Sequence, residues 1–235
     1  MKRMEALFAA NRFVDEYYPQ CQAAVLAGSV VRGEETPTSD LDIVIFDNQI
    51  QNAYRESRIE YNWPIEVFVH TLTSYKTYFQ TDAERARPTL PRMVAEGIVL
   101  VDAGILSNIK NEAAVLLNNG PAPWSEQTLL TKRYMLTDAL GDLLGTQNEA
   151  EALFIANTLG EAIHEFVLRT NGKWIGASKW IIRALKQYDE DFANRFVSAF
   201  HSFYKTGDRE GIINITDEVL APYGGRLFEG YSLGK

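Results

Sequence analysis

Two aspartates, separated by one residue, stand at the start of a short apolar run. Asp40 and Asp42 lead into Ile43-Val44-Ile45-Phe46, which has the length and β-branched composition of a strand. Because successive side chains of a strand point to opposite faces, the two carboxylates converge on one face. Converging acids beside apolar residues need a neutralising cation, and carboxylates combined with substrate phosphates suit magnesium. The pair therefore predicts a metal site that handles phosphorylated substrates.

The residues in front of this pair have the composition of a phosphate-binding loop. An apolar run, Val25-Leu-Ala27, ends in Gly28 and Ser29, and a turn of ten residues then leads to Asp40. Gly28 lets the backbone approach a phosphate closely, and Ser29 adds a hydroxyl and an amide donor. Arg32 is placed to bind the same anion. The stretch therefore predicts a strand, a phosphate loop and a second strand that carries two carboxylates.

This order of residues resembles the signature of the DNA polymerase β-like nucleotidyltransferase superfamily. The shared pattern is a hydrophobic residue, Gly and Ser, then ten residues, then Asp-x-Asp within a strand. The resemblance covers residues 23–70 and is greatest to the small antibiotic-modifying members, the aminoglycoside and lincosamide nucleotidyltransferases. That superfamily takes a third carboxylate from the next strand of its sheet. Glu66, within the run Pro64-Ile-Glu-Val-Phe-Val-His70, is the matching acid here.

Glu66 interrupts a run that is otherwise apolar on both faces. Alternation places Ile65, Val67 and Val69 on one face of the predicted strand, and Glu66 with Phe68 on the other. Burial among such neighbours raises the pKa of a carboxyl group towards that of a general base. Glu66 is therefore expected either to complete the second metal site or to accept the proton of the attacking hydroxyl.

The resemblance implies a magnesium-dependent enzyme that moves a nucleoside monophosphate to a small molecule. The expected co-substrate is ATP or another nucleoside triphosphate, and two magnesium ions are expected. The expected acceptor is a hydroxyl of a small molecule, for which an aminoglycoside-like antibiotic is one candidate. The implied catalytic residues and metal ligands are Asp40, Asp42 and Glu66. The implied nucleotide-binding residues are Gly28, Ser29, Arg32 and Lys179. The alternative is a non-catalytic, antitoxin-like or nucleotide-sensing regulatory module, which the loss of one acid would have favoured.

The composition of the chain limits its expected binding partners and its expected cellular location. The 235 residues carry a formal charge of −8, which argues against broad nucleic-acid binding because such proteins present an excess of Lys and Arg. A single cysteine, Cys21, permits no intramolecular disulfide. No stretch has the apolar length of a membrane span, and no hydrophobic core follows the basic start of the chain. A cytoplasmic location is expected, and the oligomeric state stays open, a homodimer included.

Two domains are predicted, with an α+β class overall. Residues 1–118 are expected to form a mixed-sheet nucleotidyltransferase domain and residues 124–235 an all-helical bundle, as in kanamycin- and streptomycin-type enzymes. Prolines, a glycine and asparagines mark the linker between them.

Several element boundaries follow from local signals in the first domain. We expect Thr73 to cap a helix, Pro88 and Pro91 to break the segment after it, and residues 95–102 to contain a short buried strand. An additional edge strand is expected around residues 58–63, after a polar connecting stretch.

The predicted bundle offers further polar candidates. Lys179, in the first turn of a helix after a glycine loop, is our first choice for a triphosphate contact and Lys173 our second, since helix N-termini attract phosphate. The alternative is that both lysines surround core tryptophans. Two acid pairs at helical spacing suit either a cationic ligand or a solvated face: Asp138 with Asp142, and Glu161 with Glu165. Arg195 and His201 weakly match a ribonuclease pattern, but an ordinary histidine is favoured.

Overall fold

A computed structural model describes residues 3–234 of the chain. The chain divides between Gly120 and Pro121 into two compact units. The predicted linker, residues 118–124, spans this point. The first unit combines a sheet with helices and the second consists of helices, which confirms the predicted α+β class.

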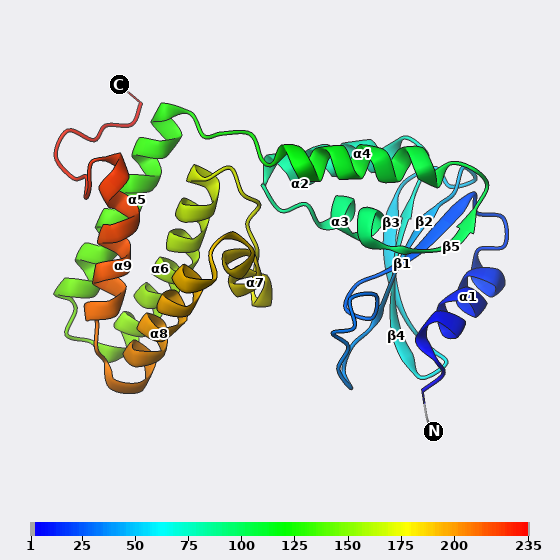
Figure 1. Cartoon of the computed structure of the whole chain (residues 1–235), viewed down its shortest axis with the longest axis horizontal. Coiled ribbons are helices and arrows are strands. Elements are labelled where there is room, and N and C mark those ends of the chain that lie inside the picture. The colour runs from blue at the N-terminus through cyan, green and yellow to red at the C-terminus, as the bar shows by residue number, and fades with distance from the viewer. Residues whose placement is uncertain (1–2, 235) are drawn as a thin grey trace. The chain divides into compact units, whose positions relative to one another are not determined.

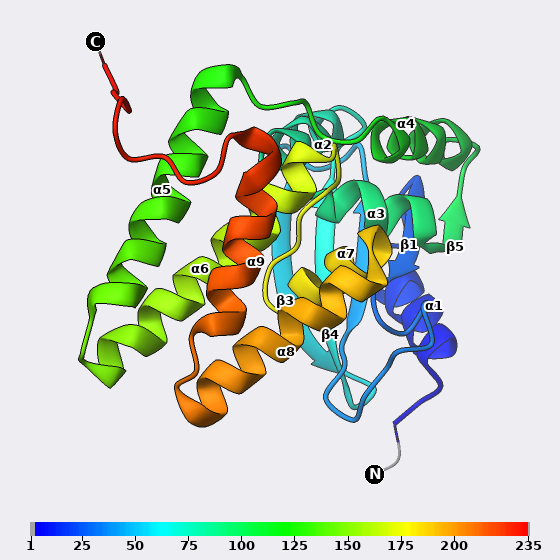
Figure 2. The same ribbon diagram turned by 60° about the vertical axis from the view of Figure 1, so that its left-hand side comes forward.

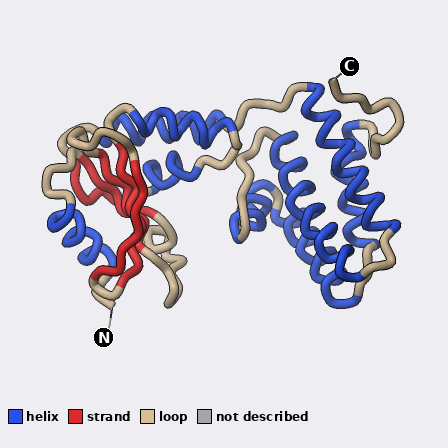
Figure 3. Tube along the Cα trace, turned by 180° about the vertical axis from the view of Figure 1, so that it is seen from behind, coloured by secondary structure: helices blue, strands red, loops and turns tan. Residues whose placement is uncertain are grey.

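One five-stranded mixed sheet forms the centre of the first unit (Figure 3). The strands are β1 (Ala23–Ala27), β2 (Leu41–Phe46), β3 (Tyr54–Glu60), β4 (Trp63–His70) and β5 (Ile98–Asp102). Their order in the sheet is β3-β4-β2-β1-β5. Neighbouring strands β2 and β4 are parallel, whereas the other neighbouring pairs are antiparallel. β2 and β4 therefore start at the same end of the sheet.

Helices cover the two faces of this sheet unequally (Figure 1). On one face α1 (Ala6–Tyr17) packs against the inward residues of the central strands. On the other face lie α2 (Ser74–Glu84), α3 (Thr89–Glu96) and α4 (Leu106–Asn119). Their buried side chains cluster with Val44 and Phe46, at the far end of β2. Asp42 lies on the same face, nearer the start of the strand, and is only half-buried.

The start of α3 shows how a proline can belong to a helix. Pro88 occupies the N-cap position and Pro91 lies in the first turn of α3. The amides of a first turn have no partner within the helix, so a proline there removes no hydrogen bond. The expectation that Pro91 breaks this segment was therefore wrong, whereas Pro88 does lie in the break between α2 and α3.

The N-terminus of α2 is capped by a different threonine from the one predicted. Thr73 stands at the N-cap position, but its side chain makes no capping hydrogen bond. Instead the hydroxyl of Thr71 accepts hydrogen bonds from the amides of Thr73 and Ser74 at 3.3 and 2.9 Å. A hydroxyl two residues earlier thus satisfies the first helical amides.

Both edges of the sheet differ from the sequence expectation. β3 begins at Tyr54, within the stretch predicted to be a connection, and turns into β4 through Tyr61 and Asn62. Both turn residues have positive φ, at 54° and 63°, which is the geometry of a tight hairpin turn. β5 is an edge strand with Ile98 and Val99 exposed by 42% and 47%, so it is not the buried strand expected.

The second unit is a helical bundle (Figure 2). Its helices are α5 (Glu126–Gly145), α6 (Glu149–Thr170), α7 (Lys179–Tyr188), α8 (Glu190–Thr206) and α9 (Glu210–Leu220), and a 3₁₀ turn, Ala221–Tyr223, follows. The side chains of Ser125, Asn148 and Asp189 accept hydrogen bonds from the first amides of α5, α6 and α8. Within residues 3–234, no helix has the length and hydropathy needed to cross a bilayer.

Candidate active site

Three carboxylates gather at one end of the sheet. Asp40 is the last residue before β2, Asp42 is the second residue of β2, and Glu66 lies on β4. The parallel register places Asp42 directly opposite Glu66. One carboxylate oxygen from each of the three residues lies within 4.8 Å of the other two. The structure therefore brings together the three acids that the sequence pattern selected.

Strand alternation accounts for the shared face of these acids. Leu41, Ile43 and Ile65 point to the opposite face, where they are fully buried against α1. A slip of one residue in the pairing of either strand would turn a carboxylate into that apolar core. The buried side chains under the site thus fix the direction of the acids above it.

Burial and mutual repulsion act strongly on Asp42. Burial, and then the charges of Asp40 and Glu66, raise the pKa of Asp42 to about 6, although Arg32 and Arg55 partly offset this. Magnesium binds oxygens at about 2.1 Å, so two ligands of one ion lie at most about 4.2 Å apart. The spacing of the three oxygens is close to that limit. The donor set therefore fits a divalent cation, which would also relieve the repulsion.

Gly28 is required by the position of Asp42. Its φ is +83°, a region that favours glycine, and a Cβ atom there would lie 2.1 Å from Oδ2 of Asp42. Any larger residue would therefore push the Asp42 carboxylate away. The sequence analysis assigned Gly28 to phosphate approach, which stays a prediction; the structure adds this steric reason.

The loop between β1 and β2 is closed by its own hydrogen bonds. The hydroxyl of Ser29 donates to that of Ser39 at 3.1 Å, and the Ser39 hydroxyl also accepts from the amide of Thr36 at 2.8 Å. The carbonyl of Ser29 accepts from the amide of Glu34 at 2.9 Å. Ser39, which sequence reasoning missed, thus ties the two ends of the loop together beside Asp40.

Arg32 connects the loop to α3. Its guanidinium forms ion pairs with Glu34 at 3.2 Å and Glu96 at 3.4 Å, and Arg92 approaches the same Glu96 at 3.8 Å. The predicted role of Arg32 in binding the nucleotide stays a prediction. If it binds phosphate, it does so in competition with these two acids.

One comparison with known protein families agrees with this geometry. Residues 9–97, which contain the loop and all three acids, match the family model described as the nucleotidyltransferase domain. The N-terminal unit contains a nucleotidyltransferase domain. A solved structure of a nucleotidyltransferase-like protein from Exiguobacterium sibiricum 255-15 aligns with 93% of this chain and 75% of its own, at 10% identity and a TM-score of 0.46. No curated protein matches the sequence significantly.

The presence of this domain carries two chemical implications. The nucleotidyltransferase domain implies a divalent metal and a nucleoside triphosphate substrate. The cluster of Asp40, Asp42 and Glu66 is the candidate metal site among the described residues. The acceptor of the nucleotide is not identified by the family.

An arginine that the sequence analysis did not select also contacts the candidate site. Arg55, on β3, donates from Nη2 to Oε2 of Glu66 at 2.5 Å, and its guanidinium carbon lies 4.9 Å from the ring centroid of Phe68. Its strand, Tyr54–Glu60, carries charged residues on both faces and lacks an apolar alternation. The only sequence signal was the short β-prone segment just before Trp63, too weak to place Arg55 beside Glu66.

Lys179 lies in the helical unit, as the first residue of α7, and is exposed. Its predicted contact with the triphosphate stays a prediction. The loop before it is tightly built: a Cβ atom on Gly176 would lie 2.1 Å from the carbonyl oxygen of Trp180. Nε2 of buried His164, a residue that sequence reasoning passed over, lies 3.1 Å from the carbonyl oxygen of Gly176 and donates to it. These contacts fix the path of the chain into α7.

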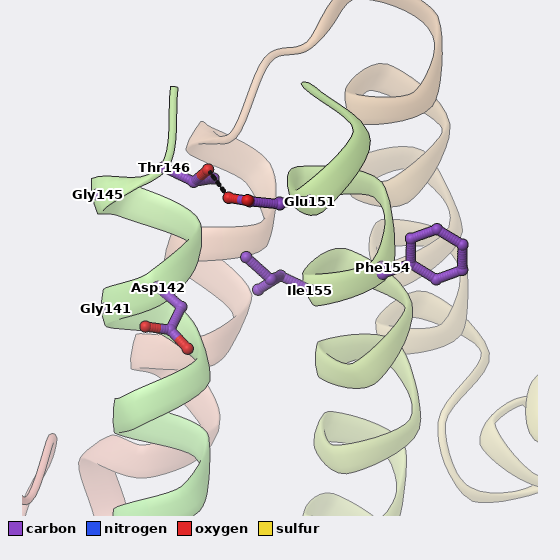
Figure 4. Close-up of a pocket in the computed structure, with 7 residues that line it drawn as sticks. All are labelled: Gly141, Asp142, Gly145, Thr146, Glu151, Phe154 and Ile155. Carbon is purple, nitrogen blue, oxygen red and sulfur yellow. Dashed lines mark hydrogen bonds between the residues drawn. The ribbon is translucent and has the colours of Figure 1, made fainter. Parts of the chain in front are cut away.

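The acid pairs of the helical unit have different surroundings. The carboxylate of Glu165 pairs with Lys132 at 2.7 Å, so it is already neutralised within the bundle. Asp142 lines an open pocket of about 610 Å³ between α5 and α6 (Figure 4). In this pocket Glu151 accepts a hydrogen bond from the Thr146 hydroxyl at 2.8 Å. The expectation of a cationic ligand at these helix faces thus loses the contribution of Glu165.

The weak ribonuclease pattern receives no support from the structure. Arg195 pairs with Glu218 through both terminal nitrogens. His201 is exposed on α8. Arg195 is therefore occupied by a structural ion pair.

Proposed function

We propose that this protein transfers a nucleoside monophosphate from a nucleoside triphosphate to a hydroxyl of a small molecule and releases pyrophosphate. Within this proposal, ATP is the donor and AMP the transferred group. The observation that carries it is the convergence of three carboxylates within 4.8 Å in a nucleotidyltransferase domain. All three acids are present, which favours an enzyme over a non-catalytic regulatory module.

In the proposed reaction, Asp40, Asp42 and Glu66 would hold two magnesium ions, which would supply charge neutralisation for an in-line displacement at the α-phosphorus. The hydroxyl oxygen of the acceptor forms a bond to the α-phosphorus. The bond between that phosphorus and the oxygen bridging to the β-phosphate breaks, and pyrophosphate leaves. The proton of the hydroxyl passes to Glu66 or to solvent, according to whether Glu66 serves as base or as metal ligand.

The loop after β1 supplies the groups that hold the departing phosphates. Gly28 and Ser29 offer amide donors, and the hydrogen bond from the Ser29 hydroxyl to the Ser39 hydroxyl keeps the loop closed. A preformed loop avoids part of the ordering entropy that phosphate binding would otherwise cost. Arg32 adds a charge-assisted contact once it leaves Glu96, and Lys179 is a further proposed triphosphate contact.

The test is pyrophosphate release from each of the four common nucleoside triphosphates with magnesium and a panel of hydroxyl acceptors, aminoglycosides included. Asp40→Asn and Asp42→Asn should each abolish acceptor-dependent release. Glu35→Gln, which removes an exposed acid from the same loop, is the matched control and should retain it. A preference for a triphosphate other than ATP would correct only the identity of the donor.

Binding of the nucleotide separates the remaining outcomes. Magnesium-dependent binding that is lost in Asp42→Asn supports the site even before an acceptor is found. If the wild-type protein binds no nucleoside triphosphate with magnesium, the enzyme is excluded and the regulatory module becomes the better account.

A further inference from the structure

β3 extends the face of the sheet that carries the three acids. Arg55, Ser57 and Ile59 form an exposed row on this strand, and Ile59 is 80% exposed. The antiparallel register places Ser57 opposite Glu66, so the row continues the line of the carboxylates. Other residues of β3 face α1 instead; for example, Glu56 accepts a hydrogen bond from the hydroxyl of Tyr18 at 2.6 Å. The row is therefore open to a ligand.

The strand order decides which substrate meets this row, if the proposed function holds. The phosphate loop follows β1, on one side of β2, whereas β4 and β3 lie on the other side. In an in-line displacement, the attacking oxygen and the leaving group lie on opposite sides of the phosphorus. With pyrophosphate held by the loop, the acceptor enters over β4 and β3. The β3 row is thus the wall of the acceptor site.

The guanidinium of Arg55 is held in place on β3 and still has N–H groups that can donate hydrogen bonds. Its ion pair with Glu66 uses one N–H of a guanidinium that carries five. The contact with the Phe68 ring fixes the plane of the group. Its side chain is nevertheless 57% exposed. A second anion can therefore bind to the outer edge of the guanidinium without displacing Glu66.

We propose that the acceptor is a small molecule with an anionic group, a phosphate or a carboxylate, which Arg55 binds while the hydroxyl faces Glu66. A planar guanidinium binds such oxyanions through two parallel hydrogen bonds. Neighbouring residues on one face of a strand are about 7 Å apart, and Arg55 lies opposite Phe68, two residues beyond Glu66 on β4. The anionic group is therefore expected within about 7 Å of the reacting hydroxyl. A cationic acceptor, such as an aminoglycoside, would meet repulsion at the same place. The charge of −8 disfavours a long polyanion.

The experiment compares acceptors that differ only in charge. One trio is glycerol phosphate, glycerol and aminopropanediol; a second is glucose phosphate, glucose and aminodeoxyglucose, each with the charged group on the terminal carbon. Pyrophosphate release is measured with magnesium and the preferred triphosphate, and kcat and KM are determined for each member. We expect kcat/KM for the anionic member to exceed that for the neutral member by about tenfold to a hundredfold, the usual worth of a charge-assisted bidentate contact.

Variants of two arginines on the same strand assign the preference to one side chain. Arg55→Gln should raise KM for the anionic member by a larger factor than KM for the neutral member, since both reactions lose the ion pair with Glu66. Arg55→Lys keeps the charge without the planar fork and should retain part of the preference. Arg58→Gln is the matched control, because Arg58 points to the opposite face and pairs with Glu56. That variant should keep the full preference.

The outcomes separate this inference from the proposed function. Equal use of the three members, a preference for the cationic member, or no use of any anionic member would overturn the inference while magnesium-dependent nucleotide binding stands. An equal loss with all members in Arg55→Gln would also overturn it, because Arg55 would then only orient Glu66. Absence of nucleotide binding in the wild-type protein would instead contradict the proposed function itself.

Discussion

The two ends of β2 and β4 have the same backbone and alternation but different surroundings. At one end Asp42 and Glu66 are half-buried and lie outside the core cluster that α2, α3 and α4 form on this face. At the other end, on the same face, Phe46 is fully buried among side chains of α2, α3 and α4. His70 is also buried there, 4.8 Å between ring centroids from Tyr78. The helices thus decide which half of the face stabilises the fold and which half is left for chemistry.

Burial acts on the titratable groups at both ends, with opposite signs. It raises the pKa of Asp42 to about 6 and lowers the pKa of His70 to about 4, because each group loses water around its charged form. At neutral pH His70 is therefore uncharged, whereas Asp42 is ionised against its neighbours. At neutral pH the end with the acids holds an electrostatic cost that a bound cation can relieve, and the following predictions test that contrast.

The largest effect is expected at Asp42. Asp42→Asn should reduce nucleotidyl transfer by about a hundredfold to a thousandfold, the range found when a group that stabilises transition-state charge is removed. Without metal, the variant should be more stable than wild type at pH 8, by roughly 1–3 kcal/mol. The pKa of Asp42 is raised in the folded state, so its contribution to stability is lost as pH rises from about 4 through about 6.

Urea unfolding at pH 8, with and without magnesium, measures the free energy of unfolding of the wild-type protein and of Asp42→Asn. Magnesium should stabilise the wild-type protein more than the variant. A metal-free Asp42→Asn variant that is less stable than wild type would show that the acids contribute favourably to folding even without a cation.

The closed end should respond in the opposite way. Phe46→Ala should lower the free energy of unfolding by about 3–5 kcal/mol, because it removes a fully buried ring and leaves a cavity among α2, α3 and α4. The folded Phe46→Ala variant, measured at saturating magnesium, should keep a kcat within a few-fold of wild type. Hydrogen exchange of β2 peptides measures the loss of stability, and pyrophosphate release measures kcat. A large fall in kcat with little loss of stability would remove the distinction between the two ends.

The pH dependence of stability should reveal His70. Its pKa is lowered in the folded state, so its stabilising contribution is present above the unfolded value of about 6.5 and is lost as pH falls towards about 4. Between pH 7.5 and 4.5 this contribution should fall by about 2–3 kcal/mol. His70→Phe should remove most of that loss. NMR titration of the imidazole gives the pKa directly, and a value near 6.5 would contradict the prediction.

The smallest effect compares two glycines of the phosphate loop. Both Gly28 and Gly33 have positive φ, but a Cβ atom on Gly33 meets nothing within 4 Å, whereas on Gly28 it would meet Asp42. Both alanine variants should therefore lose about 1–2 kcal/mol of the free energy of unfolding through backbone strain. Only Gly28→Ala should also weaken activity, by about tenfold to a hundredfold, through displaced geometry. Equal kinetics for the two variants would show that the contact with Asp42 is unimportant.

Local patterns were sufficient for much of the fold. The alternation around Asp42 and Glu66 predicted two strands and the face of each acid, because strand periodicity depends only on neighbours in the chain. The sequence also predicted an all-helical bundle over residues 124–235, where the structure has helices α5 to α9. Prediction failed where a weak local signal was overridden by packing: β3 has no apolar alternation, and α3 contains Pro91 in its first turn.

The sequence by itself determined the identity and spacing of the three acids, and the glycine and serine of the loop before them. Tertiary structure alone decided that Asp42 and Glu66 share a register, that Gly28 lies against Asp42, and that Arg55 reaches Glu66. Each of these depends on pairing between segments distant in the chain, which local propensity does not encode. The same is true of the helices that cover Phe46 and leave Asp42 open, because burial depends on which elements pack together.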